Sequence, residues 1–179
     1  MNFLFMGKET MTSVPSLKHL LTQGQNVVFA VIRPDDEKLK SMCESAGIPY
    51  GSEEEFLSQQ KNLPEIDYLL SYYWKLVKEP ILKLARYGSI NFHPGPLPEA
   101  RGSGYHAAIL EKWNYWGVTA HWMDSTFDTG RIIECSRFSI PANIVNCDLV
   151  QMAHEHLYGL FCVILDRILA GDKLSAESQ

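Results

Sequence analysis

The chain has 179 residues, a length that supports one domain with an apolar core and no need for disulfides or a metal. Its residues are 46% hydrophobic and 21% charged, which is typical of a globular protein. The formal net charge of −5 argues against a domain that binds mainly by neutralising nucleic-acid phosphates. We therefore expect a single domain over residues 1–179 with no nucleic-acid partner.

The sequence carries no signal for a metal, a leader peptide or a membrane span. Its four cysteines are far apart and form no CxxC pair, as is common for reduced thiols in the cytoplasm. His154 and His156 fall two residues apart in a predicted helix, where they point to different sides and cannot share a metal. The amino terminus lacks the charged segment of a signal peptide, and no apolar run is long enough for a bilayer. We expect a cytoplasmic protein with no bound metal and no membrane partner.

Strand and helix patterns alternate through the first half of the chain. Apolar, partly β-branched runs predict strands at residues 3–6, 26–33 and 66–74. Helical spacing of apolar residues predicts helices beginning near Ser13 and at 37–46, 53–59 and 80–86. This alternation predicts an α/β, Rossmann-like fold, a mostly parallel sheet with helices on both faces. Ligands of such folds bind beyond the carboxyl ends of the strands.

The second half continues with shorter elements. A fourth strand is predicted at 88–92, and two more at 117–123 and 131–140. A long amphipathic helix is predicted at 148–169. Three aromatic residues, Trp113, Tyr115 and Trp116, precede the strand at 117–123, and packing is a better explanation for them than stacking on a ligand.

Two polar side chains end the fourth strand. Asn91 and His93 are two residues apart, so both project to the same side of the strand, and a proline-rich loop at 94–98 follows. An amide and an imidazole placed in this way can both donate hydrogen bonds to a developing oxyanion. A capped strand end with an incidental surface histidine explains this segment about equally well.

A second polar segment lies between the two later strands, where a loop closed by Gly130 carries Asp124 and Asp128. Either acid alone is explained by turn chemistry. Together with Asn91 and His93, however, a carboxylate completes a set that can orient an imidazole and relay a proton.

Five motifs in this order and spacing resemble the 10-formyltetrahydrofolate-dependent formyltransferase family, from the first strand to about Ile140. The motifs are Asn91-Phe-His93, Pro96-Leu-Pro98, Arg101-Gly102, Gly117-Val-Thr119 and Asp128-Thr-Gly130. The resemblance implies an enzyme that uses 10-formyltetrahydrofolate as formyl donor, with Asn91, His93 and Asp128 as catalytic triad. In its motifs the chain is most similar to amino-sugar N-formyltransferases and methionyl-tRNA formyltransferases.

The resemblance also implies residues that hold the folate, in a segment after the third strand and around the aspartate loop. The matching positions are Tyr73, Trp74, Lys75, Leu76, Val77, His121 and Asp124. An apolar slot with a few backbone hydrogen bonds suits a flat heterocycle. Without the resemblance, the aromatic residues of this segment are better explained by core packing.

The formyl acceptor is the most open part of the prediction. Enzymes that formylate glycinamide ribonucleotide have a glycine-rich phosphate loop after the first strand, whereas residues 7–13 contain one glycine. Methionyl-tRNA formyltransferases add a basic carboxy-terminal domain, for which this acidic chain offers no counterpart. We therefore favour the amine of a nucleotide-linked sugar, bound near Arg101, Gly102 and Tyr105, in a chain that could form a homodimer.

Three alternatives remain at this stage. They are a methionyl-tRNA formyltransferase-like catalytic domain, a hydrolase that releases formate from 10-formyltetrahydrofolate, and a non-catalytic folate- or nucleotide-binding module. The complete set of Asn91, His93 and Asp128 argues against the binding module.

Overall fold

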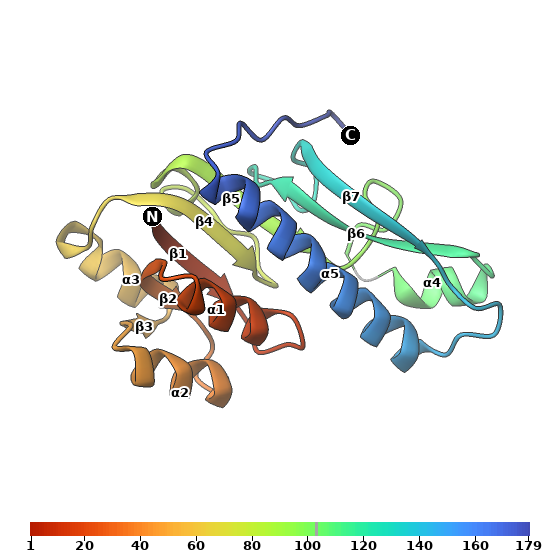
Figure 1. The fold of residues 1–179 in the computed structure, drawn as a ribbon, viewed down its shortest axis with the longest axis horizontal. Helices are drawn as coiled ribbons and strands as arrows, with labels where there is room; N and C mark the ends of the chain where they lie inside the picture. Colours follow the sequence, from red (N-terminus) through yellow and green to blue (C-terminus); the bar gives the residue numbers. More distant parts are fainter. Residues whose placement is uncertain (103) are drawn as a thin grey trace. The chain divides into compact units, whose positions relative to one another are not determined.

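The computed structural model describes residues 1–102 and 104–179 (Figure 1). The described residues form a seven-stranded sheet in the order β3-β2-β1-β4-β5-β6-β7. The expected α/β class, with a mostly parallel sheet and helices, is confirmed. The chain packs as two compact units, residues 1–91 and 92–179, and each is described by itself. That both units act as one domain stays a prediction.

Parallel strands form the first unit. They are β1 (Asn2–Gly7), β2 (Asn26–Val31), β3 (Tyr50–Gly51), β4 (Ile66–Tyr72) and β5 (Ala85–His93), the last of which runs two residues past the unit boundary. β1 pairs with β2 and β4, β3 pairs with β2, and β5 pairs with β4. Residues 3–6 are completely buried, because a central parallel strand is covered on both faces, and this explains its continuous apolar run.

Four helices of the first unit precede β4. They are α1 (Ser13–Thr22), α2 (Glu37–Ala46), α3 (Glu53–Gln59) and the 3-10 helix η1 (Gln60–Asn62). The C-cap of α2 is Gly47, whose backbone is left-handed with a φ of 68°. Glycine adopts this conformation at little energetic cost because it has no Cβ. α3 begins with a capping box between Ser52 and Glu55. The predictions for 37–46 and 53–59 are confirmed.

The helix predicted at 80–86 is wrong. Only a 3-10 turn, η2 (Ile81–Lys83), forms there, and β5 begins at Ala85. Ala85 lies opposite Ile66 in the parallel ladder of β4 and β5. Pairing with a neighbouring strand satisfies the backbone here, and this tertiary contact overrides the weak helical pattern.

The second unit contains a β-hairpin covered by a long helix. β6 (Tyr115–Trp122) and β7 (Ile132–Ser139) are antiparallel. α4 (Tyr105–Leu110) precedes them, and α5 (Asn146–Leu169) follows and packs along β6 (Figure 1). The buried face of α5 consists of Leu149, Ala153, Leu157, Leu160, Phe161, Ile164, Leu165 and Ile168. Spacings of three and four residues place these side chains on one stripe of the helix, and each larger one stabilises the unit by roughly 1.5–3 kcal/mol.

In the part of the chain that the structure describes, no helix combines the length and the apolar character needed to cross a membrane.

Candidate active site

His93 ends β5 and is 5% exposed. Its Nε2 lies 2.7 Å from the carbonyl oxygen of Ala100, at the far side of the proline-rich loop. A carbonyl oxygen only accepts hydrogen bonds, so Nε2 carries the proton and Nδ1 is the basic nitrogen of the neutral ring. The loop thus fixes both the orientation and the tautomer of His93.

Two side chains of β6 hold this loop in place. The hydroxyl of Thr119 donates to the carbonyl oxygen of Gly95 at 2.8 Å and accepts from the amide of Leu97 at 3.1 Å. The indole nitrogen of Trp116 donates to the carbonyl oxygen of Pro94 at 3.0 Å. Thr119 and Trp116 are completely buried, and the two bonds of Thr119 are shielded from water. This gives the Gly117-Val-Thr119 motif a physical role as the support of the loop after His93.

Asp128 lies between two histidines. One carboxylate oxygen is 3.5 Å from Nδ1 of His93, and the other is 3.6 Å from Nε2 of His121. The amide of Gly102 donates to the same carboxylate at 3.2 Å. His121 is 2% exposed, and its Nδ1 lies 2.9 Å from the carbonyl oxygen of Trp122.

The two histidines are therefore anchored in the same way. In each ring, one nitrogen donates to a backbone carbonyl, and the other faces the Asp128 carboxylate. In their neutral forms, two basic nitrogens and one carboxylate converge on a single small region. This cluster of His93, His121 and Asp128 places a basic nitrogen of His93 beside a carboxylate, an arrangement suited to accept and release a proton.

Burial and charge act in opposite directions on these groups. Burial lowers the pKa of His93, and the nearby Asp128 carboxylate raises it by a smaller amount, so that the pKa stays below its ordinary value. For Asp128, burial raises the pKa, but the contacts with His121, His93 and the Gly102 amide together lower it below its usual range. At neutral pH, His93 is neutral and Asp128 is ionised, which are the forms that accept a proton.

The opposing effects lead to a prediction about the titration of His93. Asp128→Asn removes the charge that raises the pKa of His93 and leaves the burial that lowers it. The pKa of His93 is therefore expected to fall further, and an NMR titration of the histidine ring protons would measure this.

The matched control is Asp124→Asn, in the same loop. The Asp124 side chain accepts hydrogen bonds from Thr126 and Thr129 and is not among the groups that shift His93. The titration midpoint of His93 should stay unchanged in this variant. A rise in the midpoint with Asp128→Asn would contradict the assigned cluster.

The other predicted residues fall into two groups. Asn91 lies two residues before His93 on β5, the spacing that gives two strand residues the same side. The predicted folate segment, residues 73–77, follows β4 in the first unit, where Trp74 lies below the guanidinium of Arg33 at 5.3 Å and Val77 is buried. A folate-binding role for this segment stays a prediction.

The predicted acceptor residues have varied surroundings. Arg101 is exposed and donates to the side chain of Gln179 at 2.9 Å, and Gly102 contacts Asp128 as described. The ring of Tyr105 stacks on Trp116, with centroids 5.0 Å apart, and its buried hydroxyl has no hydrogen-bond partner among the described residues. The aromatic residues predicted to pack do so, since Trp113 stacks on Tyr115 as well.

Three contributors to the site were not identified from the sequence. The carbonyl of Ala100 is a backbone group, and no residue pattern marks it. Thr119 belongs to the Gly117-Val-Thr119 motif, but the motif alone does not indicate what its hydroxyl contacts. Gln179 contacts the backbone of Asp128 and Gly130, which lie about fifty residues earlier in the sequence. Sequence patterns do not reveal contacts between residues so far apart.

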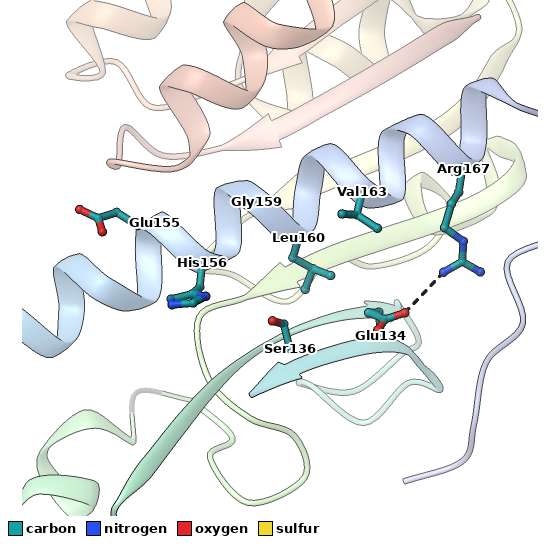
Figure 2. Close-up of a pocket in the computed structure, with 8 residues that line it drawn as sticks. All are labelled: Glu134, Ser136, Glu155, His156, Gly159, Leu160, Val163 and Arg167. Carbon is teal, nitrogen blue, oxygen red and sulfur yellow. Dashed lines mark ion pairs between the residues drawn. The ribbon is translucent and has the colours of Figure 1, made fainter. Parts of the chain in front are cut away.

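A separate groove of about 610 Å³ lies between β7 and α5. Figure 2 shows Glu134 and Ser136 facing Leu160 across it, with Arg167 and Glu134 paired at 3.5 Å. His156, an exposed residue of α5, lines this groove and stacks on Phe138 with centroids 3.8 Å apart. None of the predicted site residues lines the groove, so the site is defined by its side-chain chemistry and not by this groove.

Comparison with known proteins gives consistent results. The family model described as formyl transferase matches residues 1–158. The methionyl-tRNA formyltransferase of Caldanaerobacter subterraneus is 30% identical over 187 residues, which is 94% of this chain and 59% of that protein. That of Halothermothrix orenii is 34% identical, over 74% of this chain and 47% of that protein. The chain thus spans at most about 60% of the length of these relatives.

Solved structures share the fold at low sequence identity. Glycinamide ribonucleotide transformylase 1 from Symbiobacterium toebii has a TM-score of 0.82 at 16% identity, covering 99% of this chain and 93% of that one. The N-formyltransferase from Helicobacter canadensis, solved with folinic acid and dTDP-3-aminofucose, has a TM-score of 0.79 at 23% identity, covering 99% and 66%. Since the family model matches residues 1–158 of the 179, the chain belongs to the formyl transferase family.

Proposed function

We propose that this chain transfers a formyl group from 10-formyltetrahydrofolate to a primary amine. The observation that carries the proposal is the convergence of the Asp128 carboxylate with two buried histidines, His93 at the end of β5 and His121 on β6. An amine that gains an acyl group must lose a proton, and this cluster has the protonation state to receive it. Family membership supports the same reaction.

The hydrogen-bond donor at the end of β5 suits 10-formyltetrahydrofolate as the source of the formyl group. When bound, 10-formyltetrahydrofolate supplies a formyl group whose carbon is electrophilic and whose oxygen gains negative charge as the amine adds. The carboxamide of Asn91, on the same strand as His93, is a donor suited to that oxygen. Residues 73–77 are proposed to contact the folate ring system.

The proton then follows a path through the cluster. The new bond joins the amine nitrogen to the formyl carbon, and the bond from that carbon to the donor nitrogen breaks. His93 takes the proton of the amine at Nδ1, and Asp128, 3.5 Å away, stabilises the resulting imidazolium. The proton passes on to the departing nitrogen, so that no charge is left on either product.

For the acceptor, we propose the amine of a nucleotide-linked sugar. The acidic net charge of −5 supports it over tRNA, and so does Arg101, an exposed guanidinium next to Gly102, which contacts Asp128. A guanidinium binds phosphate through paired hydrogen bonds. Methionyl-tRNA is the second candidate, and it is favoured by the relatives at 30% and 34% identity.

The test is a product assay with the full chain and 10-formyltetrahydrofolate. The amines offered are a dTDP-linked amino sugar, glycinamide ribonucleotide and methionyl-tRNA, and one reaction contains no amine. Mass spectrometry identifies the formylated product, and released formate is measured in parallel. We expect the formylated amino sugar. Formate alone in every reaction would establish the hydrolase. If neither a formylated amine nor formate is formed, the non-catalytic binding module is the remaining alternative.

Salt dependence separates the two acceptors independently of turnover. An RNA-binding protein loses affinity log-linearly with salt, in proportion to the phosphates that it contacts. We expect no measurable binding of initiator tRNA at about 0.15 M salt, because the chain is acidic. Tight binding that weakens steeply with salt would overturn the sugar acceptor and leave formyl transfer in place.

A further inference from the structure

The segment after α5 returns to the catalytic loop. Ile132, the first residue of β7, and Glu177 form an antiparallel bridge in which each amide donates to the other's carbonyl at 2.8 Å. The guanidinium of Arg131 donates to the carbonyl oxygen of Ala176. These contacts tie residues 176–177 to the strand that follows the loop of Asp128.

Gln179 extends this tail to the loop itself. Its side-chain nitrogen donates to the carbonyl oxygens of Gly130 at 2.7 Å and Asp128 at 3.0 Å. Its side-chain oxygen accepts from Arg101 at 2.9 Å. One carboxamide therefore joins the backbone of the catalytic aspartate to the arginine assigned to the acceptor.

The backbone that Gln179 holds has an uncommon conformation. Asp128 has a φ of 53°, in the left-handed region that most residues avoid and that aspartate adopts more readily than most. Contacts from the surrounding chain help to keep this conformation. Gly102, the neighbour of Arg101, donates to the Asp128 carboxylate, so the same two segments are joined a second time.

We propose that Gln179 is a positioning residue of the site. It holds the Asp128 loop so that the carboxylate faces His93 and His121, and it orients the Arg101 guanidinium toward the acceptor. This inference rests on the proposed function for its kinetic consequences. The geometric part, the fixed loop, can be measured without turnover.

Two substitutions test separately the side-chain nitrogen of Gln179, which contacts the loop, and its side-chain oxygen, which contacts Arg101. Gln179→Glu keeps an oxygen for Arg101 but places a carboxylate against two carbonyl oxygens, so the contact with the loop is lost. Gln179→Lys keeps a donor for the carbonyls but repels Arg101. Ser178→Ala, which changes an exposed neighbour in the tail, is the matched control.

We expect opposite kinetic patterns. Gln179→Glu should lower kcat by about tenfold to a hundredfold, because small misplacements of a catalytic group are costly. It should also speed hydrogen exchange at the Gly102 amide, which is bonded to Asp128. Gln179→Lys should raise the KM for the acceptor and lower kcat less than the glutamate does. Ser178→Ala should change none of these.

Equal loss of kcat in both variants, or unchanged exchange at Gly102 in Gln179→Glu, would overturn the assignment. Failure of the proposed function looks different. In that case the wild-type chain formylates no amine, while the exchange rate at Gly102 still reports whether Gln179 holds the loop.

Discussion

Replacing Asp128 with alanine is expected to lower kcat by roughly a hundredfold to ten-thousandfold, the usual contribution of a positioned acid or base. The carboxylate faces His93 at 3.5 Å and His121 at 3.6 Å, so its loss removes the group that stabilises a proton on His93. The dissociation constant of a folate analogue should change by no more than a few fold, because the role assigned to Asp128 belongs to the transition state.

Steady-state kinetics and calorimetric titration would measure these two quantities. His93→Ala and Asn91→Ala should be similarly impaired. The pair His93→Ala with Asp128→Ala should be little worse than either change alone, since residues that act as a unit are not additive. Asp172→Ala, an exposed acid after α5, serves as the control. Turnover close to wild type in Asp128→Ala would remove the aspartate from the mechanism.

Gly130→Ala is expected to damage both stability and activity. A methyl group at Gly130 would overlap the carbonyl oxygen of Trp122, a backbone atom that cannot move aside cheaply. Overpacking of this kind costs about 1–3 kcal/mol, or roughly 2–12 °C in Tm for a chain of this size. The same carbonyl accepts the hydrogen bond from His121, so the displaced oxygen would also disturb the base cluster.

Gly159→Ala provides the contrast. Gly159 lies in α5 with nothing within 4 Å of the added methyl group. Alanine is a better helix former than glycine by about 0.8–1 kcal/mol, so this variant should be slightly more stable. Thermal unfolding followed by circular dichroism would compare the two. A Tm for Gly130→Ala equal to that of wild type would mean that the loop can rearrange around the methyl group.

Much of the fold could be predicted from the sequence, because its signals are local. The buried strands β1 and β2 are marked by continuous apolar runs, and α3 by the residues of its capping box. The failure at 80–86 has a physical cause, since only the neighbouring strand decides that residues 85–87 extend β5. No pattern within that segment carries this information.

The site residues, too, divide into those marked by local sequence signals and those that depend on contacts between distant segments. His93 and Asp128 were identified from short motifs, and the structure brings them together with His121. The carbonyl of Ala100 and the carboxamide of Gln179 could not have been identified in this way. Their contributions depend on where the backbone passes, and only the folded chain determines that.

Two separate requirements restrict which residues position 128 can accept: its left-handed backbone and its role in turnover. Glycine, asparagine and aspartate tolerate such a φ, whereas β-branched residues are strongly disfavoured. A library randomised at this codon and sorted only for folding would therefore be enriched in these three residues. Sorting for turnover would then retain aspartate alone. The residues that survive sorting for folding would thus reflect the backbone geometry, and the residue that survives sorting for turnover would reflect the chemistry.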